Sequence, residues 1–143
     1  MSKQFTLGKN ERLKSRKLIE QLFSEGKGFV ITPFKVYYLI PEKALTTHHS
    51  SVSQSLSKGT TQFGVGVSAK NFKKAVDRNR IKRLTRESYR LQKNPLHEKL
   101  TSKNIQLNIF FIYTGKELPE YNEVYKKVGS ALSKLDKLID SVQ

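Results

Sequence analysis

The amino-acid sequence predicts an α+β domain built on one small sheet. Segments with strand periodicity alternate with segments of helical periodicity, the length of 143 residues fits a single hydrophobic core, and no internal repeat is visible. Hydrophobic residues make up 36% of the chain, which is enough for a packed core. We therefore expect residues 1–143 to form one domain.

The first expected elements are a helix and a strand. Apolar residues recur at helical spacing between Ser15, a good N-cap, and Gly26, a typical helix stop. The segment 29–40 is rich in β-branched and aromatic residues and predicts one strand. Alternation along this strand places Tyr37 on the opposite face from Val36.

Two further strands and two helices follow. The alternating segments 62–68 and 105–113 predict strands, and the two glycines of the first share one face with Ser68. A basic helix is expected between them, over 70–93, and a last amphipathic helix begins near Pro119.

Two segments lack the signals of regular structure. Residues 1–14 are expected to form a basic arm, and the Ser/Thr-rich segment 44–61 a flexible loop. His48 and His49 lie in that loop with no third ligand nearby, so we expect solvated residues rather than a metal site. His97 is isolated and is expected at the surface or at its boundary.

The charge of the chain is strongly positive and clustered. Lys and Arg number 27 against 12 Asp and Glu, a net charge of +15, and residues 70–93 alone hold ten cations and two acids. At about 100° per residue, Ile81, Leu84, Ser88 and Leu91 form a narrow apolar stripe on this helix, opposite an arc of Arg and Lys. Arg guanidinium groups bind phosphate bidentately, so the helix predicts a polyanionic partner.

Several function classes are excluded by composition. The chain has no Cys, which removes disulfides, thiol nucleophiles and Cys-type zinc sites. Its apolar runs are too short for a membrane span and its N-terminus does not resemble a signal peptide, so we expect a cytoplasmic protein with no membrane partner. The acids are scattered and no catalytic motif is present, so we expect no catalytic residue and no metal site in the protein itself.

Several sequence motifs resemble those of one protein family. The run Phe63–Lys70 (FGVGVSAK), the run 75–84 (AVDRNRIKRL) and the pair Arg86-Glu87 closely resemble the protein subunit family of bacterial ribonuclease P. The opening Leu7–Ser15 (LGKNERLKS) also looks like that family. The resemblance covers nearly the whole chain in order, apart from the loop at 44–61.

The resemblance implies a fold and an activity. The fold would be a two-layer sandwich of the ribosomal protein S5 domain type, a small mixed sheet packed with about three helices and with a left-handed crossover at the basic helix. The enzyme would remove 5′ leaders from precursor tRNA, with its active site and Mg²⁺ in a large RNA subunit. The protein would bind that RNA and the leader, as a monomer with one RNA.

The resemblance also implies two sets of binding residues. The residues near the RNA subunit would be Lys70, Lys74, Arg78, Asn79, Arg80, Lys82, Arg83 and Arg86. Those of a cleft for the single-stranded leader would be Arg12, Lys14, Ile19, Phe23, Tyr37 and Ser68.

The proposed cleft has a physical basis in the sequence. An aromatic platform in a cationic groove holds single strands without reading their sequence. Tyr37 faces away from the core, and glycines on the next strand could leave open space beside it; for Phe23, core packing and the cleft are equally compatible with the pattern. Ile19 stands where the family often has an aromatic residue, Ala69 replaces a commonly basic one, and Asp77 puts a negative charge beside Arg78.

Two other functions compete with this interpretation. A non-catalytic RNA-binding protein, such as a ribosomal protein or an RNA chaperone, would have a similar basic helix. A DNA-binding regulator would need a recognition helix, and this helix offers few residues suited to base edges besides Asn79.

Overall fold

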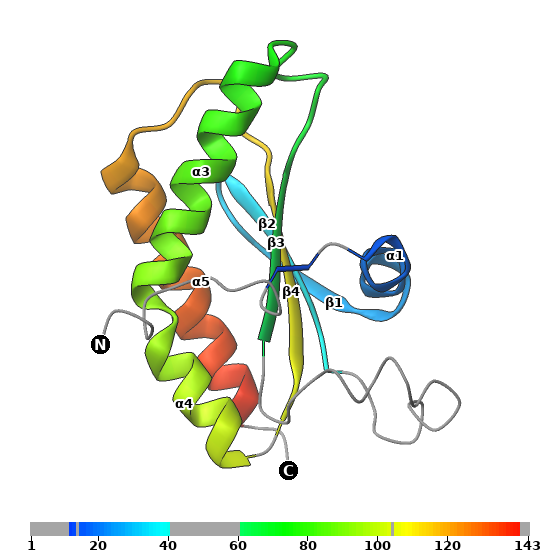
Figure 1. The fold of residues 1–143 in the computed structure, drawn as a ribbon. Coiled ribbons are helices and arrows are strands. Elements are labelled where there is room, and N and C mark those ends of the chain that lie inside the picture. The colour runs from blue at the N-terminus through cyan, green and yellow to red at the C-terminus, as the bar shows by residue number, and fades with distance from the viewer. Residues whose placement is uncertain (1–11, 14, 41–60, 104, 141–143) are drawn as a thin grey trace.

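The structure, a computed structural model, describes residues 12–13, 15–40, 61–103 and 105–140. Within these residues the chain forms four helices and four strands (Figure 1). In chain order they are α1 (Arg16–Glu25), β1 (Lys27–Ile31), β2 (Phe34–Leu39), β3 (Thr61–Val67), α3 (Ala75–Gln92), α4 (Asn94–Lys103), β4 (Leu107–Tyr113) and α5 (Tyr121–Asp140). The α+β class is confirmed, and α4 adds a helix to the expected three.

The four strands form one mixed sheet in the order β1-β2-β4-β3. β2 is antiparallel to both β1 and β4, whereas β3 is parallel to β4. Because parallel neighbours cannot be joined by a tight turn, the chain must cross over between them. It does so through α3 and α4.

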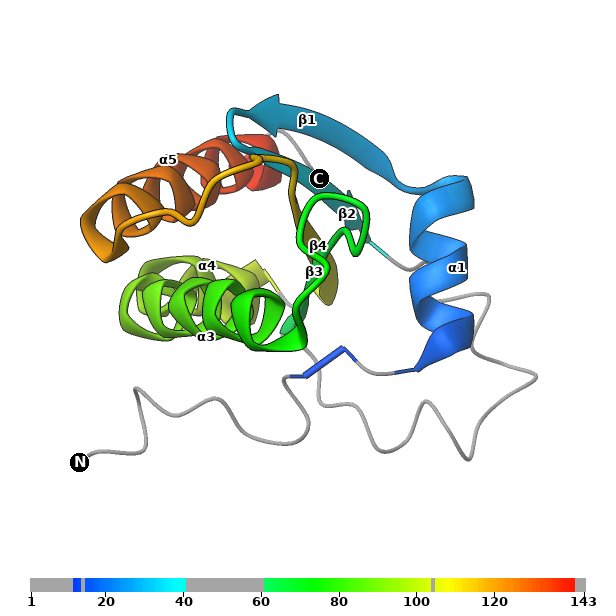
Figure 2. The ribbon, with the colours of Figure 1, turned by 90° about the horizontal axis from the view of Figure 1, so that it is seen from above.

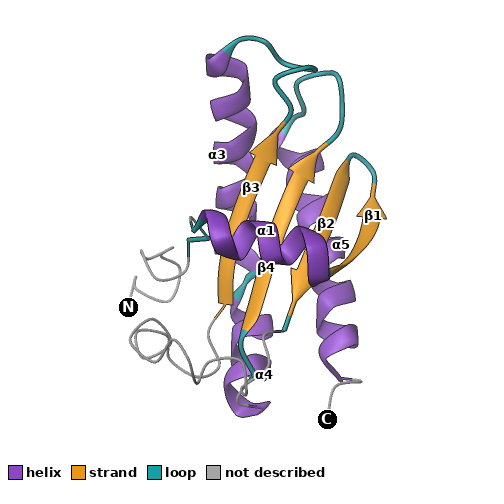
Figure 3. Ribbon diagram, turned by 90° about the vertical axis from the view of Figure 1, so that its right-hand side faces the viewer, coloured by secondary structure: helices purple, strands orange, loops and turns teal. Residues whose placement is uncertain are grey.

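Helices lie on both faces of the sheet. α3, α4 and α5 cover one face, and α1 runs across the other, as Figure 2 shows from above. In Figure 3, with α1 toward the viewer, β3 lies to the left of β4, both strands point upward, and α3 lies behind the sheet. The crossover from β3 to β4 is therefore left-handed, a hand found in only about 2% of such connections.

The main core lies between the sheet and the three helices behind it. Alternation along β2 and β4 sends Phe34, Val36, Ile109 and Phe111 to this side, where each is fully buried. Burial of apolar side chains of this size is the main favourable term in folding. The other face of the same strands carries the side chains that meet α1.

The first helix has the caps that the sequence predicts. The Ser15 side chain accepts a hydrogen bond from the Leu18 amide at 3.4 Å, and the Gly26 amide donates to the Leu22 carbonyl at 2.9 Å. Leu22 is the fully buried residue of this helix. α1 is thereby fixed across the sheet by one deeply inserted leucine and closed at both ends.

The expected single strand over 29–40 is wrong. The segment forms two antiparallel strands, β1 and β2, joined by a turn at Thr32 and Pro33. Proline has no N–H to donate to a strand ladder, so it interrupts the run and places the reversal there. The alternation beyond Pro33 holds, and Tyr37 faces away from the core as expected.

The basic helix is shorter than predicted and its buried stripe differs. It spans 75–92 instead of 70–93, and Leu91, expected in the apolar stripe, is 37% exposed. Ile81 is buried as predicted, but the largest buried side chain is Tyr89, whose ring stacks on Phe63 at 4.0 Å and 6°. A helical stripe alone did not reveal this because the partner ring comes from β3.

Parts of the expected arm and loop lie outside the described residues, namely 1–11, Lys14 and 41–60. Arg12, at the end of the arm, forms a β-bridge with Phe63 of β3, and the Leu13 amide donates to the Phe63 carbonyl at 2.8 Å. The chain therefore runs along the free edge of β3 before it enters α1.

Candidate nucleic-acid interface

The face of the sheet beneath α1 presents one row of paired residues. Phe110 of β4 stands in register with Tyr37 of β2 on one side and with Gly64 of β3 on the other. Neighbouring strands lie about 4.8 Å apart, so these three positions are direct neighbours across the sheet. The row combines two aromatic rings with a position that has no side chain.

Phe23 of α1 completes an aromatic cluster with Tyr37 and Phe110. Its ring centroid lies 4.9 Å from that of Tyr37 at an interplanar angle of 63°, and 5.4 Å from that of Phe110 at 82°. Both arrangements are edge-to-face, the geometry that favours aromatic pairs. Phe23 keeps 44% of its surface exposed, which puts a ring of this cluster in contact with solvent.

The glycines of β3 do not leave open space beside Tyr37, so that expectation is wrong. A Cβ atom at Gly64 would lie 2.7 Å from the ring of Phe110, and one at Gly66 would lie 3.2 Å from it. The ring of Phe110 fills the space over the glycines. The glycines therefore allow the ring of Phe110 to lie over β3, where it contributes to the aromatic cluster.

A cavity of about 490 Å³ opens beside this cluster, and we call it the cationic cavity. It lies between the edge of β3, α1 and α3, and the residues that line it are Arg12, Leu13, Ile19, Phe63, Gly64, Val65, Arg86 and Phe110. Phe110 belongs to both the cavity and the aromatic cluster, so the two form one continuous site. Its walls are mostly apolar and its two charged side chains are both Arg.

The two Arg side chains of the cavity repel each other. Partial burial and the neighbouring guanidinium groups of Arg12 and Arg83 lower the pKa of Arg86. Like charges that raise each other's energy are typical of a site that binds an anion, because an anion relieves the repulsion. This cavity is suited to a phosphate group next to the aromatic cluster.

The structure places some of the predicted leader-binding residues at this site and others away from it. Arg12 and Ile19 line the cationic cavity, and Phe23 and Tyr37 lie in the adjoining aromatic cluster. Ser68 lies beyond the end of β3, where its hydroxyl accepts from the Lys70 amide at 3.1 Å, and it does not line the cavity. Lys14 lies outside the described residues.

Phe110 is a residue of this site that the sequence did not single out. The alternation of β4 sends its four core residues to one face, which leaves Phe110 on the other face, together with Tyr37. That alternation was the available signal.

The predicted RNA-subunit residues follow α3 and the loop before it. Asn79, Arg80 and Arg83 are exposed on α3, and Lys82 is half-buried. Lys70 and Lys74 are exposed in the loop that connects β3 to α3. Arg86 points to the cationic cavity, so the basic surface of α3 is continuous with the aromatic site.

Two Arg of α3 already have partners in the protein. Nη1 of Arg78 donates to the carbonyl oxygens of Phe72 at 2.7 Å and of Lys73 at 2.9 Å. Nε of Arg90 donates to the Glu87 carboxylate at 3.2 Å, and this ion pair raises the pKa of Arg90. Most of the remaining cations of α3 face solvent, which favours binding of an external polyanion.

The remaining features of the described residues concern metal ligands, histidines and membrane spans. Among the described residues, no group of three or more His, Asp or Glu is arranged to hold a metal ion. Nε2 of His97 lies 3.1 Å from the hydroxyl of Tyr89 in a hydrogen bond. His48 and His49 lie outside the described residues. None of the described helices is long and apolar enough to cross a membrane.

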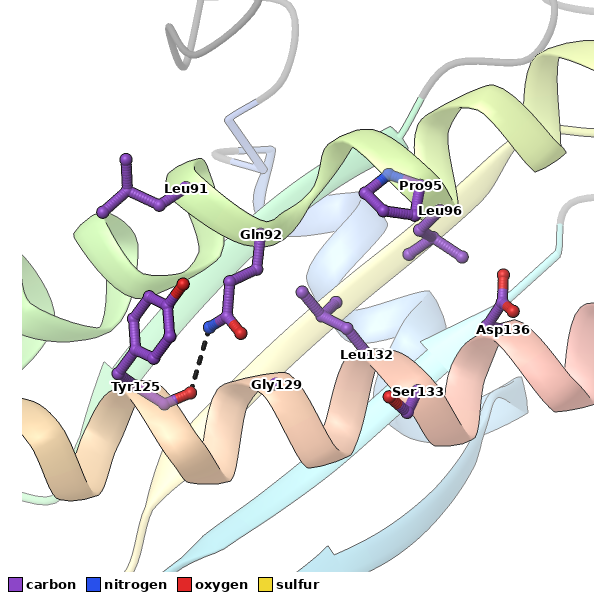
Figure 4. Close-up of a pocket in the computed structure, with 9 residues that line it drawn as sticks. All are labelled: Leu91, Gln92, Pro95, Leu96, Tyr125, Gly129, Leu132, Ser133 and Asp136. Atoms are coloured by element: carbon purple, nitrogen blue, oxygen red, sulfur yellow. Dashed lines mark hydrogen bonds between the residues drawn. The ribbon is translucent and has the colours of Figure 1, made fainter.

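A second cavity, of about 400 Å³, lies between the α3–α4 pair and α5 (Figure 4). Nε2 of Gln92 donates to the Tyr125 carbonyl at 3.0 Å across it, above Gly129. Leu91, Leu96 and Leu132 give it an apolar lining. It lies in the helical layer, on the opposite face of the sheet from the aromatic cluster.

Comparisons with known proteins agree with the resemblance. A protein-family model described as Ribonuclease P matches residues 7–136. A ribonuclease P protein component of Porphyromonas gingivalis is 37% identical over 131 residues, covering 92% of this chain and 87% of the relative. One of Chlorobium phaeobacteroides is 29% identical over 132 residues, with 87% and 84% covered.

Two solved structures share the fold. The ribonuclease P protein of Staphylococcus aureus superposes with a TM-score of 0.61 at 19% identity, covering 89% of this chain and 95% of that one. The ribonuclease P protein of Thermotoga maritima gives a TM-score of 0.61 at 23% identity, covering 87% and 96%.

Proposed function

Because this chain belongs to the ribonuclease P protein family, we propose that it is the protein subunit of a ribonuclease P that removes 5′ leaders from precursor tRNA. The protein binds the catalytic RNA subunit and the single-stranded leader, as one protein with one RNA in the bacterial cytoplasm. Cleavage takes place on the RNA subunit, which holds the Mg²⁺ ions. The protein supplies binding and no catalytic residue.

The observation that carries this proposal is the aromatic cluster beside the cationic cavity. A single strand can stack a base on Phe23, which is exposed, while its phosphate lies between Arg12 and Arg86. Stacking of one base on an aromatic side chain contributes about 1–3 kcal/mol and tolerates any base. Such a site suits a leader, whose sequence differs from one precursor tRNA to another.

The basic surface of α3 supports binding of the RNA subunit. Asn79, Arg80 and Arg83 are exposed there and are separate from the residues of the aromatic cluster. Contacts from Arg and Lys to phosphates set the position of a protein on a folded RNA without reading its sequence. The protein can therefore hold the RNA subunit through α3 and the leader through the face beneath α1.

Reconstitution tests this function. The purified protein alone should cleave no precursor tRNA, and adding it to the ribonuclease P RNA of the same organism should stimulate 5′ processing at moderate Mg²⁺. In that complex, affinity for precursor tRNA should exceed affinity for mature tRNA. Phe23→Ala should reduce this preference by roughly 5- to 150-fold, the equivalent of one stacked base.

The matched control is Tyr125→Ala, because Tyr125 is an aromatic residue of similar exposure, 37%, on α5. This variant should keep the full preference for precursor tRNA. Cleavage by the protein alone, or no stimulation of the RNA, would refute the proposal. Equal affinity for precursor and mature tRNA would favour a ribosomal protein or an RNA chaperone instead.

A further inference from the structure

The loop that connects β3 to α3, residues 68–74, is anchored at its centre. Phe72 is 6% exposed and its ring centroid lies 6.0 Å from that of Tyr113 in the core. The side-chain Nδ2 of Asn71 donates to the carbonyl oxygens of Thr114 and Gly115, in the segment after β4, at 3.5 and 3.4 Å. The Phe72 amide donates to the Ser68 carbonyl at 3.1 Å, which closes the first turn of the loop.

Arg78 attaches the last part of this loop to α3. Its Nη1 donates to the carbonyl oxygens of both Phe72 and Lys73, at 2.7 and 2.9 Å. Hydrogen bonds from a charged donor are stronger than those between neutral groups. The two bonds connect the first turn of α3 to Phe72 and Lys73 of the preceding loop.

The helix itself offers no reason for a cation at this position. A helix N-terminus carries a partial positive charge, which favours the carboxylate of Asp77 in the first turn and disfavours Arg78. The N-cap residue, Lys74, makes no side-chain capping bond. The carbonyl oxygens of Phe72 and Lys73 supply the negative partial charge that Arg78 meets there.

The loop carries cations of its own. Lys70, Lys73 and Lys74 are all exposed on it. Cations on a fixed backbone bind phosphates with a smaller ordering cost than cations on a mobile one.

We propose that Arg78 is a positioning residue, which clamps the 68–74 loop to α3 so that Lys70, Lys73 and Lys74 meet the RNA in one arrangement. This inference rests on the proposed function, and it changes the role of Arg78 from a phosphate contact to a support for other contacts.

The first test uses the free protein. Amide hydrogen exchange at Phe72 should become roughly tenfold faster in Arg78→Ala, because loss of the clamp releases the turn that protects this amide. Arg80→Ala is the matched control, since Arg80 is an exposed cation of the same turn of α3. The control should leave this exchange rate unchanged.

The second test measures affinity for the ribonuclease P RNA in a double-mutant cycle of Lys73→Ala and Arg78→Ala. If Arg78 acts through the loop, Lys73→Ala should weaken binding much less in the Arg78→Ala background than in the wild type. Two independent phosphate contacts would instead multiply their effects to within about twofold. Arg78→Lys keeps the charge, but its side chain is one bond shorter than the reach of Nη1, so it should also speed exchange at Phe72.

Unchanged exchange at Phe72 in both Arg78 variants would overturn the proposal, and so would multiplying effects in the cycle. If Arg78→Ala does not fold by circular dichroism, Arg78→Lys replaces it in both tests with the same expectations. Failure of the wild-type protein to bind the RNA would refute the proposed function, and with it the RNA role of the clamp. The exchange measurement is independent of RNA and distinguishes the two failures.

Discussion

At the scale of single residues, the position of Phe110 depends on the absence of a side chain at Gly64. A Cβ atom there would lie 2.7 Å from the Phe110 ring and 3.2 Å from the Leu13 carbonyl oxygen. We expect Gly64→Ala to lower the free energy of unfolding by about 1–3 kcal/mol, because the ring must leave its place on the sheet. Urea unfolding followed by circular dichroism measures this cost.

Gly66→Ala is the matched control, because its Cβ atom would lie 3.2 Å from the same ring and asks only a small shift. It should lower the free energy of unfolding by less than Gly64→Ala does. The double variant Gly64→Ala/Phe110→Ala should lose less free energy of unfolding than the two single variants added together. The reason is that Phe110→Ala removes the ring with which the new Cβ atom clashes. An equal cost at both glycines, or strict additivity, would show that Phe110 is not held in this way.

Some site residues could be predicted from the sequence and others could not. The strand alternation placed Tyr37 away from the core, and the same reasoning applied to β4 would have found Phe110. The bonds of Arg78 could not be predicted in this way. The direction of a long side chain depends on where the carbonyl groups of an irregular loop lie, and no periodicity encodes that.

At the scale of secondary-structure elements, one cluster of ion pairs joins α4 to α5. Nζ of Lys99 lies 3.0 Å from the Asp136 carboxylate and 2.7 Å from that of Asp140. The hydrogen bond from Lys99 to Asp140 raises the pKa of Lys99 most, and the hydrogen bond to Asp136 is the next largest cause. The hydrogen bond from Lys99 lowers the pKa of Asp140.

These shifts predict two losses of stability with pH. The lowered pKa of Asp140 gives stability that is present above the aspartate pKa of the unfolded chain and is lost as pH falls through the lower folded value. The raised pKa of Lys99 gives stability that is present below the lysine pKa of the unfolded chain and is lost as pH rises through the higher folded value. Lys99→Met should reduce both losses in a series of urea midpoints against pH.

Lys126→Met is the control for that series, because Lys126 is an exposed lysine of α5 outside the cluster. It should leave the pH dependence of the midpoint unchanged. The same dependence in Lys99→Met and the wild type would mean that the cluster adds nothing measurable, as is common for exposed ion pairs.

The elements were predictable to different degrees. Helix α1 was predicted with both of its ends, because Ser15 and Gly26 make local bonds that the sequence itself encodes. The hairpin at Pro33 was missed because the residues on both sides of Thr32 and Pro33 are β-branched and aromatic, so that two short strands look like one. The left-handed crossover was implied by the family resemblance alone, since the general rule favours the opposite hand.

At the scale of the whole molecule, the fold brings the basic helix α3 toward the chain before α1. Arg86 comes from α3 and Arg12 from the segment bound to the edge of β3, and they meet at the cationic cavity. These two residues are far apart in the sequence and come together only when the sheet has formed. Their repulsion is therefore a property of the folded protein. An anion in this cavity should therefore stabilise the entire fold.

Sulfate in low millimolar concentration tests this expectation. At matched ionic strength, sodium sulfate should raise the urea midpoint of the wild-type protein more than sodium chloride does. Binding adds RT ln(1 + [L]/Kd) to the free energy of unfolding, about 1.4 kcal/mol when sulfate is tenfold above its Kd.

Sulfate also stabilises proteins in general through exclusion from their surface, so a variant must separate the two effects. Arg86→Gln removes the guanidinium that Arg12 and Arg83 repel, whereas Arg90→Gln removes a guanidinium that is already paired with Glu87. The excess effect of sulfate should disappear in Arg86→Gln and remain in Arg90→Gln. An equal excess in both variants would mean that sulfate acts on the molecule as a whole, and that the repulsion around Arg86 does not create an anion site.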